Sequence, residues 1–284
     1  MIKITQLGDA VKLENLQGFS ADRTFDCGQC FRFEKSDESW CGVAFGKYIT
    51  FTQTAPDTLV ISPCLKHEVE EWIWFLRLDE DYTLLQQAIL AAARDYGAEE
   101  IMTAAIQAGH GIRILRQDSW EALCSFIISQ NNNIGRIKKN IFSISSALGT
   151  KISCDNDNSY TFPKPEALCG SSEEELRKLG LGFRAKYVLN AAEMICSGKI
   201  DLLSVAKSDI NQGLETLMAI KGVGPKVAAC ALLFGFGKGE AFPEDVWIKR
   251  SLLRLPAGFN SAIFGENAGL AQQYLFYLER YTKG

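Results

Sequence analysis

The most informative segment of this 284-residue chain reads Ile220-Lys221-Gly222-Val223-Gly224-Pro225-Lys226-Val227-Ala228. Two glycines allow a tight turn between two helices, and Pro225 suits the first position of the second helix. That helix would expose backbone N–H groups at its N-terminus, which is a ready site for an anion such as a phosphate. Any hairpin of two helices with a glycine turn gives the same pattern, so the segment alone leaves phosphate binding and plain packing both open.

Side chains that follow the turn in the sequence are candidates for catalysis. Lys226 lies in the first turn of the expected helix, where the positive end of the helix dipole favours the neutral amine that a nucleophile needs. Cys230 follows at i+4, so both side chains share one face of the helix. Asp245 follows Pro243 at the expected start of the next helix, where its carboxylate can accept a proton from Lys226 and stabilise a sugar cation. Taken singly, Lys226 is equally suited to bind a phosphate, and Asp245 to cap a helix.

The chain divides into a strand-rich part and a helical part. Residues 1 to about 63 contain short β-rich runs at 31–33, 40–44, 48–52 and 58–61, which predict an antiparallel meander. Past Pro63 the apolar spacing becomes helical, and from about residue 112 we expect helices only. Asp118 with Glu121 predicts a capping box that opens one of them. We expect an α+β protein, with a small N-terminal antiparallel-sheet domain with flanking helices at 1–110 and a larger all-helical domain at 111–284.

The composition is that of a globular protein. Hydrophobic residues make up 47% of the chain and charged residues 23%, which argues against disorder. The first residues carry charge and lack the apolar core of a signal peptide, and no apolar run approaches the roughly 18 residues of a membrane span. We therefore expect a cytoplasmic protein without a transmembrane segment, and we expect it to act as a monomer.

The distribution of charge bears on nucleic-acid binding. The formal net charge is −4, whereas proteins that bind nucleic acids usually carry a basic excess. Basic residues nevertheless gather beside the glycine turn, around an asparagine run at 131–133, and at positions 184–186 and 249–250. They are Arg113, Arg116, Arg136, Lys138, Lys139, Arg184, Lys186, Lys221, Lys226, Lys249 and Arg250. Local clusters of this kind are compatible with a DNA-binding face.

Nine cysteines are scattered along the chain, which is typical of reduced and mostly buried thiols. The one C-x-x-C pair is Cys27-Gly28-Gln29-Cys30. A redox role would require a βαβ setting, and a zinc site would require a second pair of ligands, whereas the chain holds only two histidines. Neither setting is present, so we expect no metal and no cofactor.

With the glycine turn and the Lys226–Asp245 pair together, the sequence resembles the helix-hairpin-helix DNA glycosylases, and within them the 8-oxoguanine DNA glycosylase/AP lyases. The similarity runs in order from about residue 25 to residue 276. In that family the lysine after Gly-Val-Gly-x is the nucleophile, and the aspartate of Pro-x-Asp-Val is its acid–base partner. The resemblance implies these roles for Lys226 and for Asp245. It also implies that 8-oxoguanine is excised from DNA through a Schiff base and that β-elimination then nicks the strand.

The same resemblance implies a pocket for the damaged base. Residues 27–32 are similar to the family's Cys-Gly-Gln-x-Phe-Arg, in which the carbonyl at Gly28 would accept a hydrogen bond from N7–H. That donor is present in 8-oxoguanine and absent from guanine. Gln272 would read the base edge, and Phe276 would stack on the base with Cys230 opposite. The i, i+4 spacing of Gln272 and Phe276 also suits plain core residues.

Contacts to the rest of the DNA are implied in the same way. Residues 125–136 look like the segment that enters the gap left by a flipped base, where Asn131, Arg136 and Arg184 would contact the orphaned cytosine. Phe183 would be a wedge beside that cytosine and would offset the lost stacking. Simpler interpretations are a polar turn at 131–133 and a core aromatic at Phe183. The implied partner is double-stranded DNA with 8-oxoguanine opposite cytosine, with phosphate contacts from Gly222, Gly224, Lys221 and Lys249.

Some positions depart from the family pattern. Trp247 stands where relatives often have a histidine near a phosphate, and Phe183 stands where a tyrosine is common. No cysteine follows Cys230, which excludes the four-cysteine cluster of the iron–sulfur branch. A monofunctional glycosylase would typically lack a lysine at position 226. A DNA-binding module without catalysis and a thiol oxidoreductase acting through the C-x-x-C pair stay open as alternatives.

Overall fold

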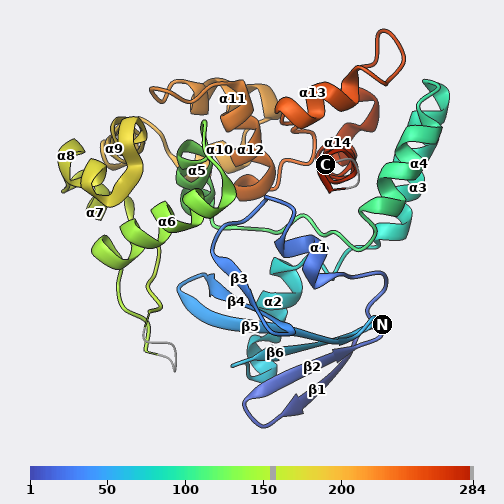
Figure 1. The fold of residues 1–284 in the computed structure, drawn as a ribbon, viewed down its shortest axis with the longest axis horizontal. Coiled ribbons are helices and arrows are strands. Elements are labelled where there is room, and N and C mark those ends of the chain that lie inside the picture. The colour runs from blue at the N-terminus through green and yellow to red at the C-terminus, as the bar shows by residue number, and fades with distance from the viewer. Residues whose placement is uncertain (154–157, 282–284) are drawn as a thin grey trace.

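The computed structural model describes residues 1–153 and 158–281, and it has an antiparallel sheet on one side and a larger group of helices on the other (Figure 1). Six strands form the sheet in the order β1-β2-β6-β5-β4-β3. Every pair of neighbouring strands is antiparallel. The expected α+β class is therefore confirmed. The strands are β1 Lys3–Leu7, β2 Ala10–Glu14, β3 Phe33–Ser36, β4 Ser39–Ala44, β5 Lys47–Ala55 and β6 Thr58–Ser62.

The sheet domain has its own hydrophobic core. Val11 and Leu13 of β2 are fully buried and alternate with outward-facing polar residues, as one face of a strand requires. Trp72 and Phe75 of α2 (Val69–Phe75) cover the sheet, and their rings lie 5.8 and 6.2 Å from the ring of Phe51. The sequence predicted strands within residues 1–63 but did not locate β1 and β2, because charged residues interrupt their short apolar alternation, and it did not predict the short helix α1 (Ala21–Phe25).

The helices form a second core, to which segments far apart in sequence contribute. Helices α3 and α4 pack beside the C-terminal helix α14 (Figure 1), and Ile89 and Met102 from them are fully buried in this core. The boundary expected at residue 110 stays a prediction. The α-helices are α3 Tyr82–Asp95, α4 Glu99–Ala108, α5 Ser119–Ile128, α6 Ile134–Leu148, α7 Pro165–Cys169, α8 Glu173–Leu176, α9 Ala185–Cys196, α10 Leu202–Lys207, α11 Ile210–Met218, α12 Pro225–Phe236, α13 Val246–Leu252 and α14 Ala268–Tyr281.

Shorter turns of helix and one small β-bridge complete the chain. Lys151 and Tyr160 form an isolated antiparallel bridge, so the expectation of helices only after residue 112 was wrong at this point. The turns are η1 Lys66–Glu68, η2 Arg177–Leu181, η3 Gly182–Arg184 and η4 Ser261–Asn267. Among the described residues, no helix is both long enough and apolar enough to span a membrane.

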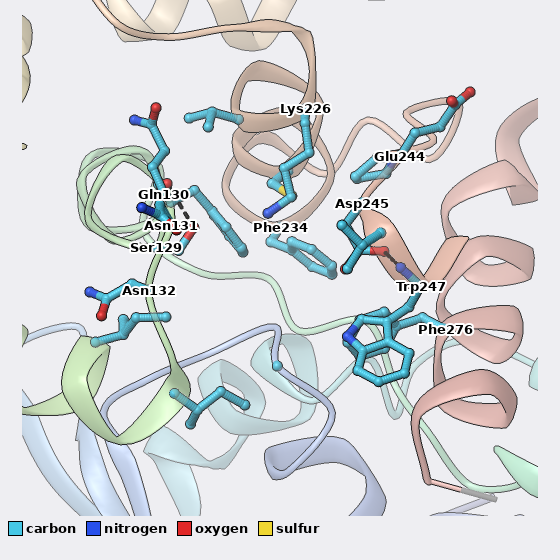
Figure 2. Close-up of a pocket in the computed structure, with 18 of the residues that line it drawn as sticks. Ser129, Gln130, Asn131, Asn132, Lys226, Phe234, Glu244, Asp245, Trp247 and Phe276 are labelled. Carbon is cyan, nitrogen blue, oxygen red and sulfur yellow. Dashed lines mark hydrogen bonds between the residues drawn. The ribbon is translucent and has the colours of Figure 1, made fainter. Parts of the chain in front are cut away.

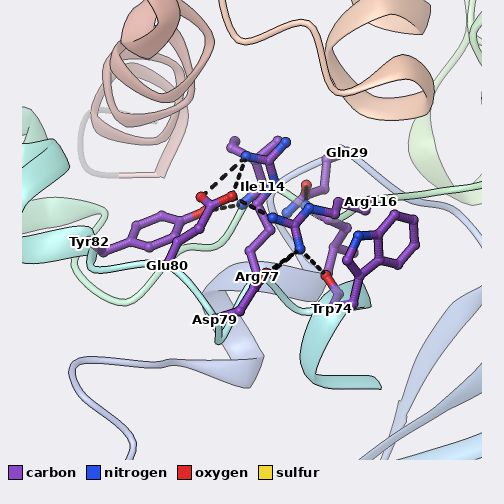
Figure 3. Close-up of polar contacts among 9 residues, drawn as sticks. Gln29, Trp74, Arg77, Asp79, Glu80, Tyr82, Ile114 and Arg116 are labelled. Carbon is purple, nitrogen blue, oxygen red and sulfur yellow. Dashed lines mark hydrogen bonds and ion pairs between the residues drawn. The ribbon is translucent and has the colours of Figure 1, made fainter. Parts of the chain in front are cut away.

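A polar network joins the sheet domain to the segment that leads into the helices (Figure 3). Arg116 donates to Asp79 at 2.9 Å, to Glu80 at 2.6 Å and to the Trp74 carbonyl at 3.0 Å. Arg77 donates to the same Glu80 carboxylate at 3.0 Å. One carboxylate thus bridges two guanidinium groups, which ties the end of α2 to the segment before α5.

The helices that bear the expected site residues begin where the sequence predicted. Pro225 is the first residue of α12, and Asp245 caps α13. Asp118 caps α5 by accepting a hydrogen bond from the Glu121 backbone N–H at 2.8 Å. The Glu121 carboxylate does not complete the expected capping box but pairs with Arg32 at 3.1 Å, because the sheet domain packs against this end of α5.

Candidate active site

One cavity of about 920 Å³ gathers most of the residues that the sequence singled out (Figure 2). Its walls come from the loop after α1, the loop before α6, the start of α12, the segment before α13, and α14. The volume lies in the range of small-molecule pockets and is large enough to admit a base and its sugar. The predicted residues that line it are Gly28, Asn131, Phe183, Gly224, Lys226, Cys230, Asp245, Lys249, Gln272 and Phe276. Four others do not line it: Arg136, Arg184, Lys221 and Gly222.

Lys226 is the second residue of α12, and its side chain projects into the cavity (Figure 2). Its Nζ lies 5.5 Å from the centroid of the Phe126 ring, which forms an apolar wall. Cys230 is one turn further along the helix and is buried. Burial raises the pKa of the Cys230 thiol and Asp245 adds to that effect, while the nearby Lys226 partly opposes it. The thiol therefore stays neutral and presents a compact, polarisable surface to the cavity.

Asp245 reaches the cavity from the cap of α13. Its Oδ1 accepts hydrogen bonds from the backbone N–H groups of Trp247 and Ile248, both at 2.9 Å (Figure 2). The cap uses one carboxylate oxygen only, so the second oxygen is left for chemistry in the cavity. These two hydrogen bonds hold the carboxylate in a fixed orientation at the start of α13. The prediction that Asp245 caps this helix is thus confirmed, and capping leaves the carboxylate available to a ligand.

Two acceptors in the cavity have no partner among the described residues. Gln272 is only 4% exposed; its Nε2 donates to the Pro243 carbonyl at 3.1 Å, while its Oε1 is buried and unbonded. The Gly28 carbonyl likewise receives no donor from residues 1–153 or 158–281. Gly28 has φ +78°, which favours glycine, and a β-carbon there would lie 3.7 Å from the Phe276 ring. A ligand with donors on two edges would satisfy both acceptors.

The C-x-x-C pair has no redox character in this structure. Both Cys27 and Cys30 are buried free thiols. Burial raises the pKa of the Cys27 thiol to about 12 and raises the pKa of Cys30 as well. A redox-active pair needs an accessible thiolate of low pKa, so the oxidoreductase alternative loses its support. No group of three or more potential metal ligands occurs in the part of the chain that the structure describes.

The glycine turn joins α11 to α12 as a helical hairpin (Figure 1), and Gly224 at the end of the turn lines the cavity. Gly222 has φ +83°, and a β-carbon there would approach the Tyr187 ring to 2.4 Å, so only glycine fits. The Lys221 N–H is held by the Asn190 side chain at 2.9 Å, and the Lys221 side chain is exposed. Gly224 caps α12 without a side-chain acceptor, which leaves the first N–H groups of that helix open to an anion.

The loop that contains the asparagine run at 131–133, called the asparagine loop below, is supported by Arg184. This guanidinium donates to the carbonyls of Gln130 at 2.7 Å and Asn131 at 2.6 Å, and it is 3% exposed. Burial and the nearby charge of Arg136 lower the pKa of Arg184. Asn131 itself is exposed with φ +47°, a conformation that asparagine tolerates better than most residues. Arg184 therefore supports the loop in this structure, and its contact with cytosine stays a prediction.

Among the cavity residues that the sequence analysis did not predict, Arg280 is a charged one. Arg280 lines the cavity, and its guanidinium lies 5.5 Å from the centroid of the Phe276 ring and 3.4 Å from where a Gly28 β-carbon would be. The sequence spacing could have indicated Arg280, because this residue is at i+4 from Phe276 on the same helix. It was not used because an arginine near the end of an expected last helix is ordinarily a solvated residue.

Comparisons with known proteins agree with this geometry. One family model, the 8-oxoguanine DNA glycosylase N-terminal domain, matches residues 11–123. A second, the HhH-GPD superfamily base excision DNA repair protein, matches residues 124–258. The chain is 32% identical to an N-glycosylase/DNA lyase of Arabidopsis thaliana, over 90% of this chain and 76% of that protein. It is 31% identical to a probable N-glycosylase/DNA lyase of Methanothermobacter thermautotrophicus, over 72% of each.

Solved structures give the same relationship. The chain is similar to the Clostridium acetobutylicum 8-oxoguanine glycosylase/lyase, solved in complex with double-stranded DNA containing cytosine opposite 8-oxoguanine. The TM-score is 0.89 and the identity is 34%, with 100% of this chain and 99% of that chain covered. Sequence, fold and cavity thus agree: the chain belongs to the 8-oxoguanine DNA glycosylase family of the HhH-GPD superfamily and is an N-glycosylase/DNA lyase of base excision repair.

Proposed function

We propose that Lys226 is the nucleophile that releases 8-oxoguanine and that Asp245 is its acid–base partner. The observation that carries the proposal is that both side chains enter one cavity from the N-terminal ends of two different helices (Figure 2). Phe126 and Cys230 are buried and lie beside the Lys226 side chain. The remaining carboxylate oxygen of Asp245 is free to accept a proton or to face a cation.

The reaction follows from these two groups. Asp245 accepts a proton from Lys226 and so supplies a neutral amine. The amine lone pair forms a bond to C1′ of the sugar while the bond from C1′ to the base nitrogen breaks, and the departing base keeps that electron pair and takes up the proton that Asp245 holds. Positive charge develops on the sugar in this step, and Asp245, which becomes a carboxylate again as it gives up that proton, stabilises the charge. The adduct opens to a Schiff base, and loss of a 2′ proton then expels the 3′ phosphate and nicks the strand.

We propose that the two unpartnered acceptors select the damaged base. 8-Oxoguanine carries a hydrogen on N7, which the Gly28 carbonyl can accept, whereas N7 of guanine is itself an acceptor and would face that carbonyl unfavourably. Gln272 Oε1 can accept from the donors on the opposite edge of the base. Phe276 supplies a face for stacking, and Cys230 closes the other side. A small pocket discriminates most strongly against a ligand that would leave one of the buried polar groups of the pocket without a hydrogen bond.

We propose that the partner of this cavity is duplex DNA with cytosine opposite the lesion. The complex of the Clostridium acetobutylicum relative contains that pair. In this chain, Phe183 is 41% exposed beside the asparagine loop, which suits a wedge, and Arg136 is exposed at the start of α6. The open N–H groups at Gly224, with the exposed Lys221 and Lys249, suit phosphates of the lesion strand.

Two substitutions test the catalytic pair. Lys226→Gln removes the nucleophile, so we expect no strand cleavage and no Schiff base. Asp245→Asn keeps a residue type that caps helices, so the fold should persist while excision slows by roughly 10²- to 10⁴-fold. Excision is measured under single-turnover conditions on a duplex with 8-oxoguanine opposite cytosine, with Lys199→Gln, an exposed lysine outside the cavity, as the control. Parental activity in either catalytic variant would overturn the assignment of that residue.

A further inference from the structure

The loop that carries Gly28 is held by contacts from both sides, and helix α14 supplies one side. Gln273 is 3% exposed, and its Nε2 donates to the Cys27 carbonyl at 2.8 Å. Tyr281, two turns further along α14, donates its hydroxyl to the Asp26 carbonyl. Two consecutive carbonyls of the loop are therefore bonded to the same helix. The next carbonyl, that of Gly28, is the one that no described donor reaches.

The other side of the loop is fixed by a buried glutamine of the loop itself. Gln29 donates from Nε2 to the Thr24 carbonyl at 2.8 Å and to the Arg113 carbonyl at 2.7 Å. Its Oε1 accepts from the Leu115 backbone N–H at 2.8 Å. These bonds attach the loop to the segment before α5, but they do not attach it to the wall that carries Phe276. Among the described residues, the hydrogen bonds from the loop to the helix that carries Phe276 are those of Gln273 and Tyr281.

The residue before Gln273 in the sequence makes a similar hydrogen bond to another wall of the cavity. Gln272 holds the Pro243 carbonyl, which lies two residues before Asp245, whereas Gln273 holds the Cys27 carbonyl, next to Gly28. Adjacent residues on an α-helix point about 100° apart, so one helix turn can serve two walls of the cavity. The pair of glutamines thus connects the base-reading loop to the segment that carries the catalytic carboxylate.

From this arrangement we propose that Gln273 is a positioning residue for lesion recognition: it fixes the Gly28 carbonyl at the place where N7–H of 8-oxoguanine is read. The inference rests on the role of Gly28 proposed above. Gln273 lines the cavity, but its donor is bonded to the Cys27 carbonyl, so it acts on lesion recognition through that carbonyl. Without its donor, the loop would lose one of its two hydrogen bonds to α14, the one next to Gly28, and the energetic difference between 8-oxoguanine and guanine would shrink.

The test compares two substrates in one variant. Gln273→Met keeps the volume of the side chain and removes the donor. One substrate is a duplex with 8-oxoguanine opposite cytosine, and the other is the same duplex with a preformed abasic site, which needs Lys226 but no base reading. We expect 8-oxoguanine excision to fall at least tenfold, abasic-site cleavage to stay within twofold, and the preference for binding 8-oxoguanine over guanine duplex to weaken.

A matched control and distinct outcomes complete the experiment. Gln86→Met removes a comparable hydrogen bond to α14, the one that Gln86 donates to the Tyr274 hydroxyl at 2.9 Å, and should leave both reactions unchanged. Equal losses on both substrates in Gln273→Met, or no loss on either, would overturn the inference. If the parental protein cleaves the abasic duplex but does not excise 8-oxoguanine, the proposed function fails instead.

Discussion

Phe183 and Arg184 are neighbours in the chain with opposite surroundings. Phe183 is 41% exposed and packs edge-on to Tyr187, while Arg184 is buried under the asparagine loop. The Arg184 guanidinium lies 4.4 Å from the Phe183 ring centroid, which gives the exposed ring a rigid base. An exposed aromatic on a rigid support is poorly explained as a core residue, so the wedge is the better interpretation.

Replacing this ring tests that interpretation. In Phe183→Ala, the free energy of unfolding should fall by no more than about 1 kcal/mol, because the residue is 41% exposed and loses only its contacts with Tyr187 and Arg184. Affinity for the lesion duplex and the excision rate should both fall, since the gap left by the flipped base would not be filled. Leu203→Ala, which truncates a side chain 71% exposed outside the cavity, is the control. Unchanged excision together with a large loss of stability would instead identify Phe183 as a packing residue.

At the scale of elements, the α11–α12 hairpin depends on two glycines for different reasons. Gly222 is required by its positive φ and by the Tyr187 ring, which a β-carbon would meet at 2.4 Å. Gly224 has φ −96°, which any residue adopts, and a β-carbon there would meet nothing within 4 Å. The first glycine therefore serves the fold, and the second keeps the N-terminus of α12 open.

Alanine at each position separates these roles. Gly222→Ala should lower the free energy of unfolding by about 2–4 kcal/mol, from backbone strain and overpacking. Gly224→Ala should leave stability nearly unchanged and weaken duplex binding, because a methyl group would stand between the N–H groups and a phosphate. Urea denaturation and binding at one fixed salt concentration measure the two effects. A Gly224→Ala protein that binds DNA with parental affinity would argue against phosphate binding at this turn.

The sequence predicted these local features well and the long-range ones poorly. The glycine turn, the start of α12 at Pro225 and the cap at Asp245 depend on neighbouring residues, so the pattern sufficed. The hydrogen bond from Gln273 to the Cys27 carbonyl joins residues 246 positions apart, and no sequence pattern near either residue indicates it. The site residues drawn from the family resemblance meet in one cavity for the most part, while the support given by Arg184 to the asparagine loop could be seen only in the folded chain.

At the scale of the whole molecule, buried thiols make stability depend on pH. Burial raises the pKa of Cys27 from its ordinary value near 9.0 to about 12, and it also raises the pKa of Cys30 and of Cys124. The folded protein thus favours the neutral thiols, whereas the unfolded chain releases their protons above about pH 9. The stabilisation is fully present below pH 9 and is lost as the pH rises toward the folded-state values.

The free energy of unfolding should therefore fall between pH 8 and pH 10, by roughly 1 kcal/mol for each such thiol. Urea denaturation at both pH values, in the presence of a reducing agent, measures the change. Cys27→Ala removes one of the titrating groups, so its free energy of unfolding should change less over the same interval. An identical pH dependence in the parental protein and in Cys27→Ala would show that this thiol titrates alike in both states, contrary to its burial.

The most direct test of the central claim is borohydride trapping on a duplex that carries 8-oxoguanine opposite cytosine. Reduction converts a Schiff base into a stable amine, so the intermediate becomes a covalent protein–DNA complex. We predict a trapped complex with the parental protein and none with Lys226→Gln. A trapped complex of equal yield in Lys226→Gln would place the nucleophile elsewhere. No complex with the parental protein, on a strand that also stays intact after alkali, would contradict the account of this cavity as a glycosylase/lyase site.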